Sequence, residues 1–324
     1  MRIIYVGTSS FGIPVLRKLI SLGEDVVAVI TQPDRPAGRG KKMHPSPIKE
    51  VALEYGLQCF QPENINSESA IEKIRKFEPE LIILIAYGQI ISGEILKIPP
   101  RGCLNVHPSL LPYYKGSAPI QWTIIQGEQE TGISFLFMNE KIDAGDIILQ
   151  KKTEIVPDEN YQELSERLSI KSAEIMADVL DKIKKGDYKK IPQPRGKYFY
   201  ARKINKIDCK INWNNRGVDI LNLVRGIAYT PCAYTEFKGK RIKITKVFLL
   251  EPAEENREIS ERKPGDIVSV SKEGIQVLAG DHTRIVIKRL ILPGSKEMDV
   301  SQFINGYQIR VGDSFINLQT DKRK

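Results

Sequence analysis

An amide and an imidazole stand two residues apart in Cys103–Pro112, a stretch that predicts a short buried strand running into a rigid turn. Side chains alternate across a strand, so Asn105 and His107 are expected on the same face. Pro108 cannot donate to a strand ladder and marks the end of the strand. We therefore expect both side chains at the mouth of a sheet, where open α/β folds bind their ligands.

A carboxylate is the partner that this pair lacks, because it would orient the imidazole and raise its basicity. Asp143, within Asn-Glu-Lys-Ile-Asp-Ala-Gly-Asp at 139–146, is the best candidate. Together the three side chains suit direct acyl transfer between two bound substrates. Asn105 and His107 would stabilise an oxyanion, and His107 or a water ordered by Asp143 would carry the proton from an attacking amine. A lone buried histidine is more often a core residue, but the asparagine on the same face favours catalysis.

The sequence offers no convincing nucleophile and no metal ligands. There is no Gly-x-Ser-x-Gly elbow, and Cys103 lies inside an apolar strand, where a thiol is inert. The cysteines are scattered without a Cys-x-x-Cys pair, which argues against a zinc site and a disulfide framework and fits a reducing cytosol: Cys59, Cys103, Cys209 and Cys232. We expect no metal and no covalent enzyme intermediate.

The elements that must position these residues alternate between strand and helix, which predicts an α/β fold with a Rossmann-like, mostly parallel sheet. Expected strands are 2–6, 25–31, 58–61 and 81–86, and expected helices are 13–22, 48–55, 67–77 and 117–127. Residues 131–138 and 146–155 predict a hairpin around the Asp143 loop, and 159–185 predicts a long amphipathic helix. Tyr87 and Gly88 follow the central strand on the side where ligands usually bind.

Residues 32–47 are rich in proline and glycine, which predicts a long loop without regular structure. Loops of this length in compact domains are usually functional or disordered. Glycines around positive charges would let this one mould onto phosphates, with these basic residues as candidate contacts: Arg35, Arg39, Lys41 and Lys42. A solvated connector without a role is the alternative.

The composition of the sequence changes after the predicted helix at 159–185. We predict a catalytic domain over 1–187, a linker over 188–206, and a smaller C-terminal domain over 207–324 whose short strands indicate an OB-like β-barrel. Residues 191–324 hold 25 Lys and Arg against 15 Asp and Glu, whereas residues 1–190 hold 24 against 25. A basic domain beside a neutral one suggests a polyanionic partner, with a merely lysine-rich surface as the alternative.

The motifs together resemble the folate-dependent formyltransferases. The resemblance rests on Asn105-x-His107-Pro108 followed by Ser-Leu-Leu-Pro, on Lys115-Gly116-Ser-Ala-Pro-Ile-Gln and on Asp143-Ala-Gly-Asp. The basic loop Thr-Gln-Pro-Asp-Arg-Pro-Ala-Gly-Arg-Gly-Lys-Lys at 31–42 narrows it to the branch that acts on methionyl-tRNA. It covers essentially the whole chain, including the linker and the basic β-domain.

The resemblance implies transfer of a formyl group from 10-formyltetrahydrofolate, as co-substrate, to the α-amino group of methionine on initiator tRNA. It implies that Asn105, His107 and Asp143 are catalytic. It also implies a folate-contacting segment, Ser109, Leu110, Leu111 and Pro112, with Tyr87 and Gly88 lining the same pocket. Arg39 is the implied key contact of the basic loop with the tRNA acceptor end, and the C-terminal barrel would grip the tRNA backbone.

The chain departs from the family pattern in two places. Tyr113 and Lys115 stand where the family usually has arginine, and Ala-Tyr-Thr-Pro at 228–231 stands for a common Asn-Pro-Trp-Pro. Neither departure touches the predicted catalytic residues.

Three other functions remain open at this point. A sibling enzyme acting on a nucleotide or sugar amine would leave the basic loop and basic barrel unexplained. An RNA-binding protein with an inert Rossmann-like domain would not need His107. An NAD-dependent oxidoreductase, suggested by the glycine-rich turn 7–12, lacks the usual acidic residue after the second strand. The N-terminus begins with a strand and no apolar run is long enough for a membrane span, so we expect a cytoplasmic protein without signal peptide or membrane contact. We also expect a monomer.

Overall fold

The computed structural model describes residues 1–37, 42–250 and 261–316. Contacts within the chain divide it into two compact units. The first unit holds 1–119, 130–154 and 163–202, and the second holds 120–129, 155–162 and 203–324. Residues 188–202, which lie in the predicted linker, therefore group with the first unit, and the predicted division at 187 and 206 remains a prediction.

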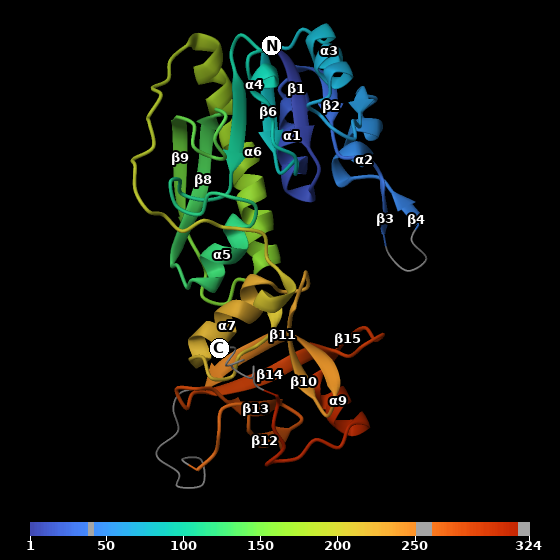
Figure 1. Ribbon diagram of the computed structural model, residues 1–324, viewed down its shortest axis with the longest axis vertical. Coiled ribbons are helices and arrows are strands. Elements are labelled where there is room, and N and C mark those ends of the chain that lie inside the picture. The colour runs from blue at the N-terminus through green and yellow to red at the C-terminus, as the bar shows by residue number, and fades with distance from the viewer. Residues whose placement is uncertain (38–41, 251–260, 317–324) are drawn as a thin grey trace, which may run out of the picture. The chain divides into compact units, whose positions relative to one another are not determined.

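A seven-stranded sheet is the centre of the first unit (Figure 1), and its strands follow the order β5-β2-β1-β6-β7-β8-β9. Their bounds are β1 Arg2–Gly7, β2 Asp25–Ile30, β5 Cys59–Phe60, β6 Leu81–Ile85, β7 Cys103–His107, β8 Glu130–Phe137 and β9 Ile147–Glu154. The pairings from β5 to β7 are parallel, whereas β8 runs antiparallel to β7 and β9 antiparallel to β8. The mostly parallel sheet and the hairpin around Asp143 are thus confirmed.

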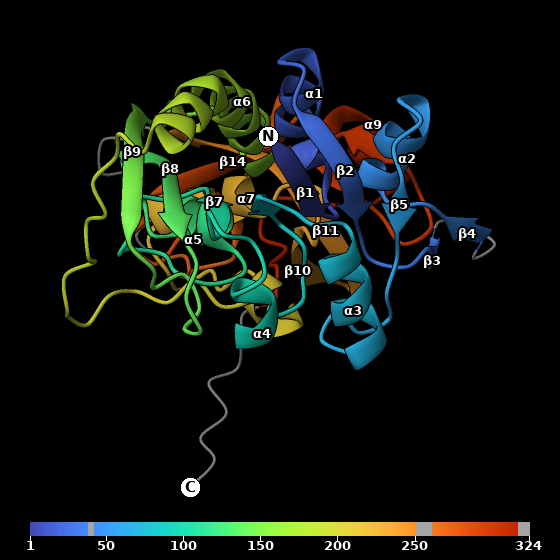
Figure 2. The same cartoon turned by 90° about the horizontal axis from the view of Figure 1, so that it is seen from above.

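Helices cover both faces of this sheet. Figure 2 shows α1 (Ile13–Ser21) and α6 (Tyr161–Lys185) on one face and α3 (Glu68–Lys76) and α4 (Gly93–Leu96) on the other. Alternate residues of β1 divide between the two faces, and Ile4 and Val6 belong to the apolar cluster that also holds residues of α3 and α4. The first unit also holds the 3-10 turn η1 (Ser10–Gly12) and α2 (Pro47–Glu54), whereas α5 (Pro119–Ile125) belongs, apart from Pro119, to the second unit.

The basic loop contains regular structure, so the prediction of an irregular segment was wrong. Two short strands, β3 (Arg35–Ala37) and β4 (Lys42–His44), pair antiparallel in a two-stranded ribbon. Such a ribbon tolerates Pro36 because an isolated pair has open edges, where a missing N–H breaks no ladder.

The second unit is an antiparallel β structure with strand order β10-β11-β14-β13-β12, and β15 pairs with β14. Its elements are η2 Lys206–Cys209, α7 Gly217–Gly226, β10 Ala233–Phe237, β11 Lys240–Leu250, β12 Ile267–Ser271, β13 Gly274–Leu278, β14 Arg284–Ile291, β15 Glu297–Asp299 and α9 Val300–Gly306. The backbone at 313–316 bonds to Ile267 at one end of the sheet and to Glu236 at the other. The two ends of the sheet are therefore linked, as an OB-like barrel requires.

Residues 210–213 form no strand among the described elements. Lys210 forms only an isolated bridge with Tyr234, and the Asn212 side chain accepts from the backbone N–H of Asn214 in a local turn. Such side-chain turns compete with strand pairing. Trp213 is nonetheless fully buried, and its indole N–H donates to Thr235.

Within the described residues, no helix combines the length and the apolarity that crossing a bilayer demands. In the same part of the chain, no group of three or more His, Cys, Asp or Glu side chains could hold a metal ion.

Candidate active site

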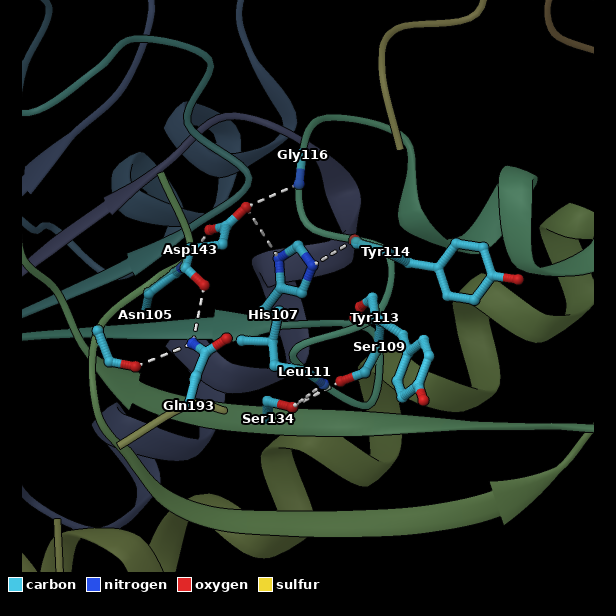
Figure 3. Close-up of polar contacts among 11 residues, drawn as sticks. Asn105, His107, Ser109, Leu111, Tyr113, Tyr114, Gly116, Ser134, Asp143 and Gln193 are labelled. Atoms are coloured by element: carbon cyan, nitrogen blue, oxygen red, sulfur yellow. Dashed lines mark hydrogen bonds and ion pairs between the residues drawn. The ribbon is translucent and has the colours of Figure 1, made fainter. Parts of the chain in front are cut away.

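Strand β7 ends with the two side chains that the sequence singles out, and both are buried. The Asn105 amide donates to Asp143 Oδ1 at 3.0 Å, and His107 Nδ1 lies 3.7 Å from Asp143 Oδ2. Figure 3 shows the three side chains facing one another. The convergence expected of these three side chains is therefore present, although the Asp143–His107 separation is an ion-pair distance rather than a hydrogen bond.

The Asp143 carboxylate has a partner on each oxygen. Oδ1 accepts from Asn105, and Oδ2 accepts from the backbone N–H of Gly116 at 2.9 Å. The residue itself has a φ of 48°, in the left-handed region that non-glycine residues rarely adopt. The loop thus holds a backbone conformation that costs energy, which the surrounding contacts must offset.

The imidazole of His107 is fixed from its other side by the Tyr114 backbone. Its Nε2 lies 2.9 Å from the carbonyl oxygen of Tyr114. A carbonyl can only accept, so Nε2 carries a proton and donates it. Nδ1, which faces Asp143, is therefore the nitrogen that can take up a proton during a reaction.

The predicted folate-contacting segment forms a hydrogen-bonded turn directly after β7 (Figure 3). The Ser109 hydroxyl donates to the carbonyl of Tyr113, and the backbone N–H of Leu111 donates to Ser134. Ser134 in turn donates to the Ser109 carbonyl, and Gln150 donates to the Leu111 carbonyl. The segment from Ser109 to Pro112 is thus rigidly attached to β8 and β9.

The other predicted folate-contacting residues follow β6. The Tyr87 side chain is 2% exposed and belongs to the apolar core, and its carbonyl accepts from Thr8. Gly88 has a φ of 95°, and a Cβ there would meet nothing within 4 Å. The open space that a ligand could enter therefore lies at Gly88 rather than at Tyr87.

Cys103 shares the strand with the site but is unreactive. Its thiol is buried, and burial raises its pKa to about 12. The thiolate, which is the nucleophilic form, is not accessible near neutral pH.

Two of the predicted tRNA contacts lie on the β3–β4 ribbon. Arg35 and Lys42 are exposed, whereas the other two predicted contacts, Arg39 and Lys41, lie outside the described residues. The base of the ribbon is anchored by the Asp34 carboxylate, which accepts from Lys49 at 2.7 Å and from Gln61 at 2.8 Å.

Three contacts of the site escape sequence reasoning because their polar groups lie on the backbone or in the predicted linker: the Tyr114 carbonyl, the Gly116 N–H and the Gln193 side chain. Gln193 donates to the carbonyls of Asp143 at 2.8 Å and Gly145 at 2.9 Å. A cavity of about 620 Å³ borders this loop, and residues including Lys115, Lys141 and Arg195 line it. No periodicity or motif in the sequence marks Gln193.

The comparisons with known proteins agree over the whole chain. Residues 1–180 match the family model described as formyl transferase, and residues 203–308 match the model described as formyl transferase, C-terminal domain. A methionyl-tRNA formyltransferase from Thermodesulfovibrio yellowstonii is 43% identical over 315 residues, which make up 97% of this chain and 98% of the relative. One from Alkaliphilus metalliredigens is 43% identical over 312 residues, covering 96% and 97%.

Solved structures share the fold at lower identity. WlaRD, a sugar 3N-formyl transferase, aligns with a TM-score of 0.65 at 20% identity, covering 89% of this chain and 97% of that one. HypX from Aquifex aeolicus, solved with tetrahydrofolic acid, aligns with a TM-score of 0.63 at 17% identity over 97% of this chain. The chain spans about half of HypX, 48% of its length.

Proposed function

The chain belongs to the methionyl-tRNA formyltransferase family, and on that premise we propose that Asn105, His107 and Asp143 catalyse its reaction. The enzyme transfers the formyl group of 10-formyltetrahydrofolate to the α-amino group of methionyl initiator tRNA, for translation initiation. The observation that carries the assignment is the contact of Asp143 with both other side chains, at 3.0 and 3.7 Å. Family membership leaves the oxidoreductase and the inert RNA-binding alternatives without support.

Asn105 stabilises the oxyanion. One N–H of its amide is committed to Asp143, and the second is left to donate to the carbonyl oxygen of the formyl group as negative charge develops there. The bond to Asp143 fixes the orientation of the amide before the substrate arrives. Loss of one such donor typically costs about 10²–10³ in rate.

His107 carries the proton. Its Nδ1 accepts the proton that the attacking amine releases, because Nε2 is already protonated and bound to the Tyr114 carbonyl. The resulting imidazolium is stabilised by the Asp143 carboxylate, which lies 3.7 Å away. The same proton can then pass to the folate nitrogen that leaves as the tetrahedral intermediate collapses.

The substrates are assigned to two parts of the chain. Ser109, Leu110, Leu111 and Pro112, with Tyr87 and Gly88, would contact the folate. Arg35 and Lys42, with Arg39 and Lys41, would contact tRNA phosphates at the acceptor end, where lysine and arginine give sequence-independent affinity. Specificity for initiator tRNA would come from the ribbon reaching the terminal base pair. Because its substrates belong to translation, the proposed location is the cytoplasm, and the proposed state is a monomer.

Formylation of charged initiator tRNA tests the assignment, with charged elongator methionine tRNA as the comparison and 10-formyltetrahydrofolate supplied. H107A and N105A should each lower kcat by about 10²–10³ because each removes a group that acts in the transition state. D143N should also lower kcat, since an amide cannot stabilise an adjacent imidazolium. Melting curves check that the variants are folded. A folded H107A chain with wild-type kcat would contradict the proposed roles.

A further inference from the structure

We infer that Gln193 is a positioning residue for formyl transfer, which holds the Asp143 loop in its reactive conformation. The inference rests on the proposed function, because it concerns the residue that would orient His107. Gln193 lies in the segment that the sequence predicts to be a linker, and nothing in its neighbourhood resembles a motif.

The hydrogen bonds of Gln193 define its role. Its Nε2 donates both protons, to the backbone carbonyls of Asp143 and Gly145 at 2.8 and 2.9 Å. Both partners can only accept, so chemistry fixes which end of the amide faces the loop. These two bonds hold the backbone on both sides of Ala144, immediately next to the residue whose φ of 48° is unfavourable for a side chain.

The loop has few other restraints on that side. Gly145 packs so closely against β8 that a Cβ would come 1.7 Å from the Phe137 carbonyl oxygen, so the loop cannot move toward that strand. On the other side, Ala144 and Gln193 line the cavity of about 620 Å³, together with Lys141 and Arg195. The two bonds from Gln193 therefore join those of the Asp143 carboxylate in keeping the loop from relaxing toward the cavity, and they are the ones that hold its backbone at Asp143 and Gly145.

Gln193 is itself held in place by the sheet. Two residues earlier, the backbone N–H and carbonyl of Ile191 both bond to Ile147 at the start of β9, at 2.9 Å each. This pairing makes the segment an extension of the sheet edge rather than a free connector.

The same segment also supports the turn that holds His107. The Tyr114 N–H donates to the Phe199 carbonyl at 3.0 Å, and the Ala201 N–H donates to the Lys115 carbonyl at 2.7 Å. The aromatic rings of Tyr113 and Tyr198 pack edge to face, 5.0 Å apart. Residues 191–202, which we call the strap, therefore bond to both backbone turns that position the reacting groups.

A displacement of the Asp143 loop by about 1 Å is enough to lower the rate by about 10². Loss of the Gln193 bonds should therefore lower kcat, while the KM values for folate and tRNA change little because both Nε2 protons of this side chain are already donated to the Asp143 loop. A residue that only stabilised the fold would change the melting temperature without this split between kcat and KM.

The test compares Q193E with Q58E, which introduces the same charge at an exposed position of the same unit. In Q193E a carboxylate replaces the donor and repels both carbonyls. We expect kcat at pH 8 to fall about 10- to 100-fold relative to Q58E, with each KM within about threefold. The half-buried carboxyl, which faces two carbonyl oxygens, should protonate at a raised pKa and then donate one hydrogen bond. The ratio of the kcat of Q193E to that of Q58E should therefore rise as the pH falls toward 5.5.

Q193A, which removes both bonds without adding repulsion, keeps the test decisive if Q193E does not fold. Its kcat should fall about tenfold, and folding is verified by circular dichroism. A folded Q193A chain with wild-type kcat, or a ratio for Q193E that does not vary with pH, would overturn the inference. A wild-type chain that does not formylate methionyl-tRNA would instead overturn the proposed function, so the two failures are distinct.

Discussion

The Asp143 carboxylate illustrates how a single residue can serve two purposes at once. One oxygen orients the Asn105 amide, and the other lies between the Gly116 N–H and the His107 ring. A carboxylate can accept at both oxygens simultaneously, whereas the amide of asparagine offers one acceptor. The residue type is therefore dictated by the number of donors that meet at this point, not only by the need for charge.

At the residue scale, Asn105 and His107 could be predicted from the sequence because a strand places alternate side chains on one face. Asp143 could be predicted only from the need for a carboxylate beside the imidazole, since 38 residues separate it from Asn105. The contacts of the Tyr114 carbonyl and the Gly116 N–H could not be predicted, because every residue except proline carries both backbone groups and the sequence does not show which are used.

Two buried tyrosines, Tyr5 in β1 and Tyr87 just after β6, allow the effect of removing a bonded and an unbonded hydroxyl on stability to be compared. The Tyr5 hydroxyl donates to the Gly12 carbonyl at 2.8 Å, whereas the Tyr87 hydroxyl is buried without a partner among the described atoms. Burial raises the pKa of Tyr87 to about 12, so its hydroxyl stays protonated in any ordinary assay. Y5F should lower the free energy of unfolding by about 1–2 kcal/mol, and Y87F should leave it unchanged or raise it.

Urea unfolding of the two variants measures this difference, and the KM for 10-formyltetrahydrofolate tests the placement of the Tyr87 ring in the core. We expect that KM to be unchanged in Y87F. A KM raised more than about fivefold, equivalent to about 1 kcal/mol, would mean that the hydroxyl reaches the folate site after all.

At the scale of elements, the β3–β4 ribbon depends on the charge of one aspartate. The hydrogen bonds from Lys49 and Gln61 lower the pKa of Asp34. A carboxyl whose pKa is lower in the folded chain than in the unfolded chain adds stability above the unfolded pKa, and this stability is lost as the pH falls through the folded value. The anchor is therefore complete at neutral pH and fails only below about pH 4.

D34N should remove that anchor at every pH. Amide hydrogen exchange at the ribbon should be faster in D34N than in D178N, an exposed control on α6. The difference in unfolding free energy between wild type and D34N should persist down to about pH 4 and shrink below it. Equal exchange of the ribbon amides in the two variants would show that its backbone pairing suffices.

The elements themselves could be predicted to within a few residues where their periodicity is strong, as for β1, β6 and α6. Two segments could not. The prolines of the ribbon predict an irregular loop rather than strands. The strap lacks the apolar alternation of a strand, so the sequence predicts a linker there. Among the described residues, the ribbon pairs only with itself. The strap is held by backbone pairing with residues distant in the sequence, such as Phe199 with Tyr114, and that kind of pairing leaves no local pattern.

At the scale of the whole molecule, the uneven charge sets the response to salt. Residues 191–324 carry an excess of ten positive charges, and the remainder is nearly neutral. Phosphate contacts release counterions, so the KM for tRNA should rise at least about tenfold between about 50 and 200 mM salt, while the KM for folate should change less than about twofold.

K42A provides the matched variant for this experiment. Removing one phosphate contact should reduce the salt slope by about one while the folate KM stays unchanged. An identical slope in K42A and wild type would show that this lysine does not contact the backbone of the nucleic acid.

The strap also determines where this chain can be recombined with a relative. A chimera whose crossover falls after Asp187 would carry the strap of the other protein. Its Asp143 loop and its turn at Tyr114 and Lys115 would then have to bond to a segment that evolved with different loops. A crossover after Arg202 keeps the native strap with its own sheet. Exchange of the C-terminal part between homologues should therefore preserve kcat when the junction follows Arg202 and lower it when the junction follows Asp187, even though composition alone places the domain boundary at the earlier point.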